Sequence, residues 1–147
     1  MAKALIIQTT IGGEIAVIGE HIADGLRHHK IEVDCKDAID IVDVGAFGGY
    51  DVIIFGSNTD LGDMPEEMKN AISIAEKADL QGKVGGAFGL PGCTRETSRR
   101  IYDKMKNVFK MKMVTAPLCL ETVSSGSAIE LANEYGQEIA QKSLFSH

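Results

Sequence analysis

The chain has 147 residues, enough for one domain with a buried core and too few for a second, so we expect residues 1–147 to form a single domain. Its composition, 44% hydrophobic and 24% charged, is typical of a globular protein, and its apolar runs are too short for a membrane span or a signal-peptide core. The net charge of -6 disfavours nucleic acid as a partner. We therefore expect a cytoplasmic protein with no nucleic-acid or membrane partner.

The first part of the chain is predicted to form a strand, a helix and a second strand. Residues 3–9 are a continuous aliphatic run, typical of a strand that is buried on both faces. Apolar residues then recur at helical spacing from Ile15 to Leu26, and a cationic stretch suited to a helix C-terminus follows. Residues 31–38 alternate between apolar and polar side chains, as expected near the edge of a sheet.

The middle of the chain continues with a link, a strand and a helix. Residues 39–50 are predicted to be irregular or weakly helical, and residues 51–57 form a second continuous apolar run, which predicts another buried strand. Residues 64–77 have helical spacing. Pro65 is expected in the first turn of this helix, where the missing N–H costs nothing.

The last part of the chain repeats this alternation. Residues 83–89 are predicted to be a fourth strand, whose glycines permit close backbone contact. A helix is expected over 94–108, a fifth strand over 112–121 and a closing helix over 127–142.

This order of elements predicts an α/β fold, specifically a three-layer α/β/α sandwich around a five-stranded parallel sheet, because parallel strands need crossover connections. Ligands of such sheets bind outside the carboxyl ends of the strands. Three loops leave these ends, at residues 9–14, 57–64 and 89–93, and all are rich in small or polar residues. Together they predict a ligand site, although each loop alone is also typical of an ordinary strand-to-helix turn.

The three loops together resemble those of the flavodoxin family. TTIGGE at 9–14 is similar to the family's hydroxyl-rich phosphate loop, and LGD at 61–63 is similar to the Met-Gly-Asp segment of the short-chain members. FGLPGC at 88–93 is similar to the family pattern F-G-x-x-G-W. The resemblance covers nearly the whole chain, and it implies the strand order 2-1-3-4-5 and one noncovalently bound FMN.

The resemblance also implies which residues bind FMN, and it implies no catalytic or metal-binding residues. The phosphate would be held by Thr9, Thr10, Ile11, Gly12, Gly13 and Glu14. The ring would lie between two groups, Ser57, Asn58, Thr59, Asp60, Leu61 and Gly62 on one side and Gly89, Leu90, Pro91, Gly92 and Cys93 on the other. Since neither group contains an aromatic residue, the ring would lack stacking contacts and FMN would bind more weakly than in typical members.

The first loop departs from the family pattern, because Ile11, Gly13 and Glu14 replace side chains that donate hydrogen bonds. Backbone N–H groups remain, and a glycine turn at a helix N-terminus binds phosphate if the Glu14 carboxylate points away. In the alternative arrangement this carboxylate caps the helix and displaces the phosphate. The residues alone leave both arrangements open.

The resemblance implies a low-potential one-electron carrier that works between redox partner proteins, as a monomer or weak dimer. Asp60 and Asp63 near the ring would disfavour added negative charge, and with Glu66 and Glu67 they would steer a basic partner. Two alternatives remain. One is a flavodoxin-fold NAD(P)H-dependent FMN reductase or a quinone or heme-pathway oxidoreductase. The other is a flavin-free interaction module, which the departures in the first loop favour.

Cys35, Cys93 and Cys119 lack the spacing of a zinc site or of a redox C-x-x-C motif. We expect free thiols, with Cys35 and Cys119 in the core or half-buried in strands. A reactive thiol at Cys93 would need a specific electropositive setting.

Overall fold

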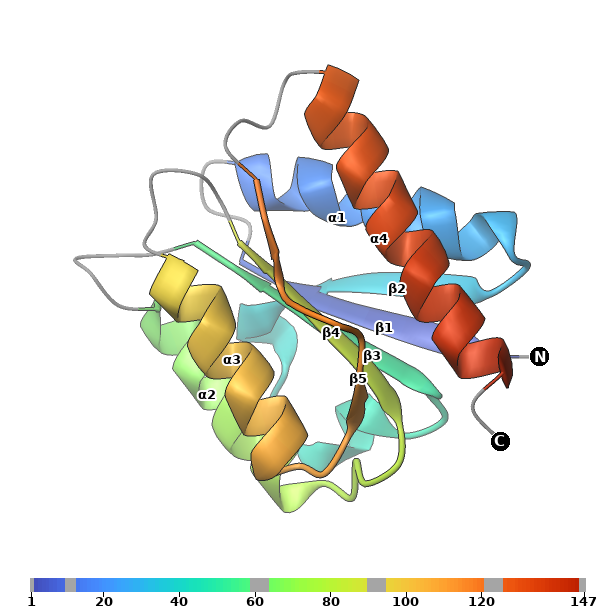
Figure 1. Cartoon of the computed structure of the whole chain (residues 1–147). Helices are drawn as coiled ribbons and strands as arrows, with labels where there is room; N and C mark the ends of the chain where they lie inside the picture. The colour runs from blue at the N-terminus through green and yellow to red at the C-terminus, as the bar shows by residue number, and fades with distance from the viewer. Residues whose placement is uncertain (1, 10–12, 59–63, 90–94, 121–125, 146–147) are drawn as a thin grey trace.

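The computed structural model describes residues 2–9, 13–58, 64–89, 95–120 and 126–145, with only the backbone of residues 95 and 96 (Figure 1). In chain order its elements are β1 (Lys3–Gln8), α1 (Glu14–His28), β2 (Glu32–Asp37), the short 3-10 helices η1 (Ala38–Asp40) and η2 (Val44–Phe47), β3 (Val52–Ser57), α2 (Glu66–Lys77), β4 (Val84–Gly89), α3 (Arg95–Asn107), β5 (Lys112–Met113), β6 (Leu118–Cys119) and α4 (Gly126–Phe145). No helix in the described ranges has both the length and the apolar composition needed to cross a membrane.

The strands form one parallel sheet in the order β2-β1-β3-β4-β5, and β6 also pairs with β4. Helices α1 and α4 cover one face, and α2 and α3 cover the other (Figure 1). The expected α/β/α sandwich with strand order 2-1-3-4-5 is therefore confirmed. The connections place every strand-to-helix loop at the same edge of the sheet.

Alternate side chains of the central strands fill two separate cores. In β1, Leu5 and Ile7 pack on the side of α2 and α3, whereas Ala4 and Ile6 pack on the side of α1 and α4. Strands β3 and β4 are buried along their whole length, as their continuous apolar runs predict. Most of β2 is exposed because it is the edge strand, so the expectation that Cys35 is buried or half-buried is wrong. Cys119 is half-buried, as expected.

The fifth strand differs from the continuous segment expected over 112–121. It is divided into β5 and β6, which lie along the same side of β4, with residues 114–117 between them. Pro117 has no N–H to contribute to a strand ladder. The intervening carbonyls find other partners, because the Tyr102 hydroxyl donates to Val114 O and the Tyr135 hydroxyl lies 2.9 Å from Ala116 O. Two tyrosines from distant helices thus replace sheet hydrogen bonds.

The link between β2 and β3 is short and weakly helical, as predicted. Asp37 accepts a hydrogen bond from Ile39 N at the start of η1, and Asp43 accepts one from Gly45 N at the start of η2. At the next helix the prediction is off by one residue. Pro65 is the cap that precedes α2, with extended ψ of 154°, rather than part of its first turn.

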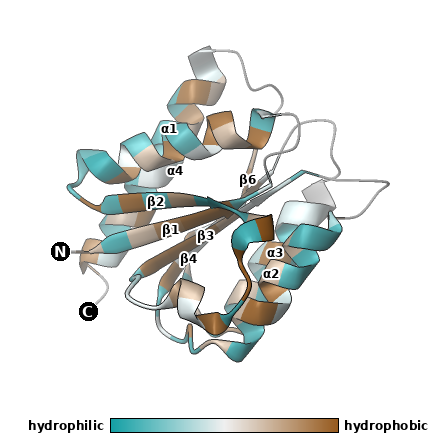
Figure 2. Ribbon diagram, turned by 180° about the vertical axis from the view of Figure 1, so that it is seen from behind, coloured by the Kyte–Doolittle hydropathy of each residue, from teal (hydrophilic) through white to brown (hydrophobic). Residues whose placement is uncertain are grey.

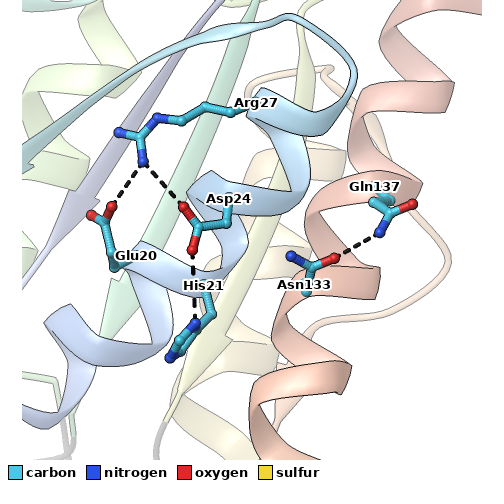
Figure 3. A network of polar contacts seen from close by, with 6 residues as sticks. All are labelled: Glu20, His21, Asp24, Arg27, Asn133 and Gln137. Carbon is cyan, nitrogen blue, oxygen red and sulfur yellow. Dashed lines mark hydrogen bonds and ion pairs between the residues drawn. The ribbon is translucent and has the colours of Figure 1, made fainter.

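Helices α1 and α4 cross in close backbone contact at two glycines. A Cβ atom on Gly25 would lie 2.1 Å from Asn133 O, and one on Gly136 would lie 2.1 Å from Ile22 O. Figure 3 shows the two helices side by side, with polar side chains on each. Arg27 pairs with Glu20 at 2.8 Å on the exposed surface of α1, a contact that contributes little to stability in water.

Candidate functional site

The carboxyl edge of the sheet gathers the ends of β1, β3, β4 and β6. Gln8 is in register with Gly56, Ser57 with Gly89, and Gly89 with Cys119. The three loops predicted from the sequence therefore leave neighbouring strands at one edge (Figure 1). This convergence is the geometry in which open α/β sheets bind ligands.

The structure describes six of the predicted site residues: Thr9, Gly13, Glu14, Ser57, Asn58 and Gly89. The others lie outside the described residues: Thr10, Ile11, Gly12, Thr59, Asp60, Leu61, Gly62, Leu90, Pro91, Gly92 and Cys93. Asp63, which was expected beside the ring, lies outside them too.

Gly13 begins helix α1 in the left-handed conformation, with φ of 77° and ψ of -12°. Other residues adopt this conformation only at a cost, so glycine is required here by the backbone rather than by crowding, because a Cβ atom would meet nothing within 4 Å. The first N–H groups of α1 and the positive end of its dipole are suited to an anion.

Glu14 occupies the first position of α1, and its side chain is exposed. Within the described ranges its carboxylate has no hydrogen-bond or ion-pair partner, and α1 has no side-chain cap. Of the two arrangements that the sequence leaves open, the described geometry has the carboxylate in solvent. The donor set at the helix start consequently fits a phosphate.

Thr9 connects the first loop with the second. Its side chain is fully buried, its Oγ1 donates to Asn58 Oδ1 at 2.6 Å, and the same oxygen accepts a hydrogen bond from Asn58 N at 3.2 Å. The Thr9 N–H donates to Gly56 O at 3.1 Å. The hydroxyl hydrogen is therefore committed to Asn58, a role that the sequence reasoning missed.

The third loop begins at Gly89, against two residues that the sequence reasoning also missed. Ser98 of α3 is buried, and its Oγ lies 3.0 Å from Cys119 Sγ. A Cβ atom on Gly89 would lie 3.2 Å from Ser98 Oγ and 3.5 Å from Ser57 O, so the absence of a side chain lets three elements meet here. The only sequence signal for Ser98 and Cys119 is their place at the start of a helix and the end of a strand.

Two aromatic or polar side chains near this edge face the core instead. The Phe88 ring lies against Gly56, where a Cβ atom would come within 2.1 Å of the ring. Gln8 is also buried, against Gly19, and its Oε1 has no hydrogen-bond partner among the described residues. Within the same residues, no group of three His, Cys, Asp or Glu side chains is placed to hold a metal ion.

Similar proteins were found by sequence and by structure, although no protein-family model matches the chain. The chain is 29% identical over 147 residues to "Probable flavodoxin 2" of Bacillus subtilis (strain 168), an alignment that covers 97% of each protein. The solved "Structure of a flavodoxin from the domain Archaea" superposes with a TM-score of 0.88 at 23% identity, and covers 97% of this chain and 99% of that one.

A more distant similarity joins the chain to a larger enzyme. It is 28% identical over 111 residues to "NAD(P)H dehydrogenase (quinone)" of Rhodopseudomonas palustris (strain TIE-1). That alignment covers 60% of this chain and 56% of the enzyme.

Proposed function

Because these similarities assign the chain to the flavodoxin family, we propose that it binds one FMN noncovalently at the carboxyl edge of the sheet and carries single electrons between redox proteins. The observation that supports this most is the start of α1, where left-handed Gly13 exposes backbone N–H groups without a side-chain cap. When bound, the flavin ring supplies reversible one-electron chemistry. The protein holds it, orients it and sets its electrostatic surroundings.

The proposed site divides the binding work among the three loops. The N–H groups of residues 12–15 and the hydroxyl of Thr10 hold the phosphate, while residues 57–62 and 89–93 flank the ring. Thr9 acts differently in this scheme: its bonds to Asn58 hold the second loop against the first. Ser57 adds to this support, since its hydroxyl donates to Asn58 O at 2.8 Å.

We also propose that the carrier works at low potential, as a single domain over residues 1–147 and as a monomer or weak dimer. Asp60 and Asp63 follow the second strand end, so their carboxylates would oppose negative charge on the ring. A change of about 1.4 kcal/mol corresponds to about 59 mV for a one-electron step.

The test is to add FMN to the purified protein, remove free FMN by gel filtration and record the visible spectrum. Flavin bands that stay with the protein support the proposal. A reductive titration of the loaded protein should then show a low potential for the second electron. A colourless protein after filtration would leave only a flavin-free interaction module, and a high potential would contradict the carboxylate argument.

A second candidate is an NAD(P)H-dependent reductase of quinones or of FMN, and the specific observation in its favour is the partial match to the quinone dehydrogenase. An enzyme of this kind would oxidise NADPH steadily when given FMN and a quinone. An electron carrier would not do so without a separate reductase. Measuring NADPH absorbance with the isolated, FMN-loaded protein separates the two.

A further inference from the structure

The link between β2 and β3 divides its apolar residues between the core and the solvent. Ala38, Ile41 and Phe47 are buried among the side chains beneath α2 and α3. In contrast, Ile39 is 69% exposed and Val42 is 77% exposed. Figure 2 shows hydrophobic residues along this link where it follows β2 and runs beside α2. Exposed aliphatic side chains that are gathered together mark interaction sites more often than isolated ones do.

These side chains border a groove of about 390 Å³ between the link and α2. Its lining residues are Ala38, Ile39, Ile41, Val42, Glu67, Asn70, Ser73 and Ile74. η1 follows the carboxyl end of β2, and Glu67 lies in the first turn of α2. The groove therefore begins at the same edge of the sheet as the proposed FMN site.

The groove wall is held in place by local hydrogen bonds. Asp37 Oδ1 accepts from Ile39 N at 3.2 Å, Asp43 Oδ1 accepts from Gly45 N at 2.9 Å, and Ile41 N donates to Ala38 O at 3.2 Å. With Ala38, Ile41 and Phe47 anchored in the core, Ile39 and Val42 are presented without a large entropic cost of ordering.

The rim of the groove is acidic. Over residues 36–47 and 66–74, two lysines, Lys36 and Lys69, stand against five carboxylates: Asp37, Asp40, Asp43, Glu66 and Glu67. Asp40, Asp43 and Glu66 are exposed. Such a rim attracts a cationic surface over a long range and opposes an anionic one.

From the groove and its rim we infer that this surface docks a basic redox protein that inserts an apolar side chain between Ile39, Val42 and Ile74 and surrounds it with lysine or arginine. The inference rests on the proposed function, because it names the class of partner that would approach the flavin edge. The apolar centre supplies affinity and the carboxylates supply steering and orientation.

A second copy of the chain is a poorer match for the groove. The most basic segment, around α3, is partly neutralised, since Arg99 lies 3.3 Å from Asp103 and Lys104 lies 3.3 Å from Glu76. A partner with unpaired cations complements the rim better.

The experiment titrates isotope-labelled protein, with and without FMN, with cytochrome c, a small basic haem protein, and follows backbone amide shifts by NMR. The matched control is succinylated cytochrome c, in which the lysine charges are replaced by carboxylates. We expect shifts centred on residues 39–44 and 67–74 with the basic protein and none with the succinylated one.

Two sets of variants separate the apolar and charged contributions. The pair Ile39→Ser and Val42→Ser should weaken cytochrome c binding by about tenfold, because two aliphatic contacts are lost. Val108→Ser, an equally exposed valine on the far end of α3, should leave it unchanged. Asp40→Asn with Asp43→Asn should reduce the salt dependence of binding, whereas Glu130→Gln on α4 should not.

Several outcomes would overturn the inference: no binding of cytochrome c, shifts centred elsewhere, unchanged affinity in the Ile39 and Val42 double variant, or shifts at the groove that depend only on the protein's own concentration. Failure of the proposed function is distinct. It would appear as loss of FMN on gel filtration while the groove still responds to cytochrome c.

Discussion

Thr9 and Asn58 stand 49 positions apart in the chain, and their side chains meet at the carboxyl edge of the sheet. Sequence reasoning placed both residues at the site but assigned the Thr9 hydroxyl to the phosphate. Their mutual contact depends on which strands become neighbours, and no local pattern encodes it. Gly13 is different, because a glycine between a strand and a helix already signals a left-handed turn.

Replacing Thr9 with Val keeps the shape of the side chain and removes its hydroxyl. Asn58 N and Oδ1 then lose their buried partner, so we expect the free energy of unfolding to fall by about 1–3 kcal/mol. Thr9→Ser keeps the hydroxyl and should retain most of the stability. Urea unfolding of the three proteins measures this, and a Val variant as stable as the parent would show that the contact does not matter.

Gly13→Ala introduces a side chain at φ of 77°, and Gly82→Ala does the same at φ of 82°, on a turn far from the site. Each should lose about 1–2 kcal/mol of stability through backbone strain. Only Gly13→Ala should also weaken FMN binding, measured by flavin fluorescence. Equal FMN affinity in the two variants would argue against a role for this turn in holding phosphate.

At the scale of elements, apolar periodicity predicted where the helices and buried strands occur, because burial in the two cores dictates that pattern. It did not predict the break between β5 and β6. That break depends on the hydroxyls of Tyr102 and Tyr135, which come from other elements and hydrogen-bond the carbonyls at Val114 and Ala116. Contacts of this kind between distant elements leave no local signal.

The crossing of α1 and α4 provides a test at this scale. Gly136→Ala would place Cβ against Ile22 O, so the helices must move apart, and we expect a loss of about 1–3 kcal/mol in unfolding free energy. Gly126→Ala, at the start of the same helix with nothing within 4 Å, should change stability by less than about 0.5 kcal/mol. Thermal or urea unfolding compares them. Similar losses in both would mean that the crossing tolerates separation.

For the molecule as a whole, the strand order was predictable once the loops were matched to a family, whereas the positions of most loop residues were not. The alternation of strands and helices restricts the topology, and the handedness of crossovers then places the loops at one edge. The β2–β3 link shows the limit of this reasoning. Its apolar residues suggested only weak helix, and the exposure of Ile39 and Val42 beside α2 came from the fold.

Stability at alkaline pH is a second property of the whole molecule. Burial, with the hydrogen bond to Asp34, raises the pKa of Tyr50 to about 12, and burial also raises the pKa values of Tyr102 and Tyr135. An unfolded tyrosine has a pKa of about 10, so these groups contribute stability that is complete below about pH 10 and is lost as the pH rises toward 12.

We therefore expect the urea midpoint to decrease between about pH 9 and pH 11. Tyr50→Phe should show a smaller decrease over that interval, although it is less stable at neutral pH because Asp34 loses its donor. The same slope in parent and variant would show that Tyr50 ionises as freely in the folded protein as in the unfolded chain.

The central claim is that the start of α1 anchors the phosphate of FMN. Comparing the affinities of the apoprotein for FMN and riboflavin, by quenching of flavin fluorescence, tests it most directly, because the two ligands differ only in the phosphate. Charge-assisted hydrogen bonds to a phosphate should make FMN bind more than about tenfold tighter than riboflavin. Equal affinities, or no binding of either ligand, would contradict the account.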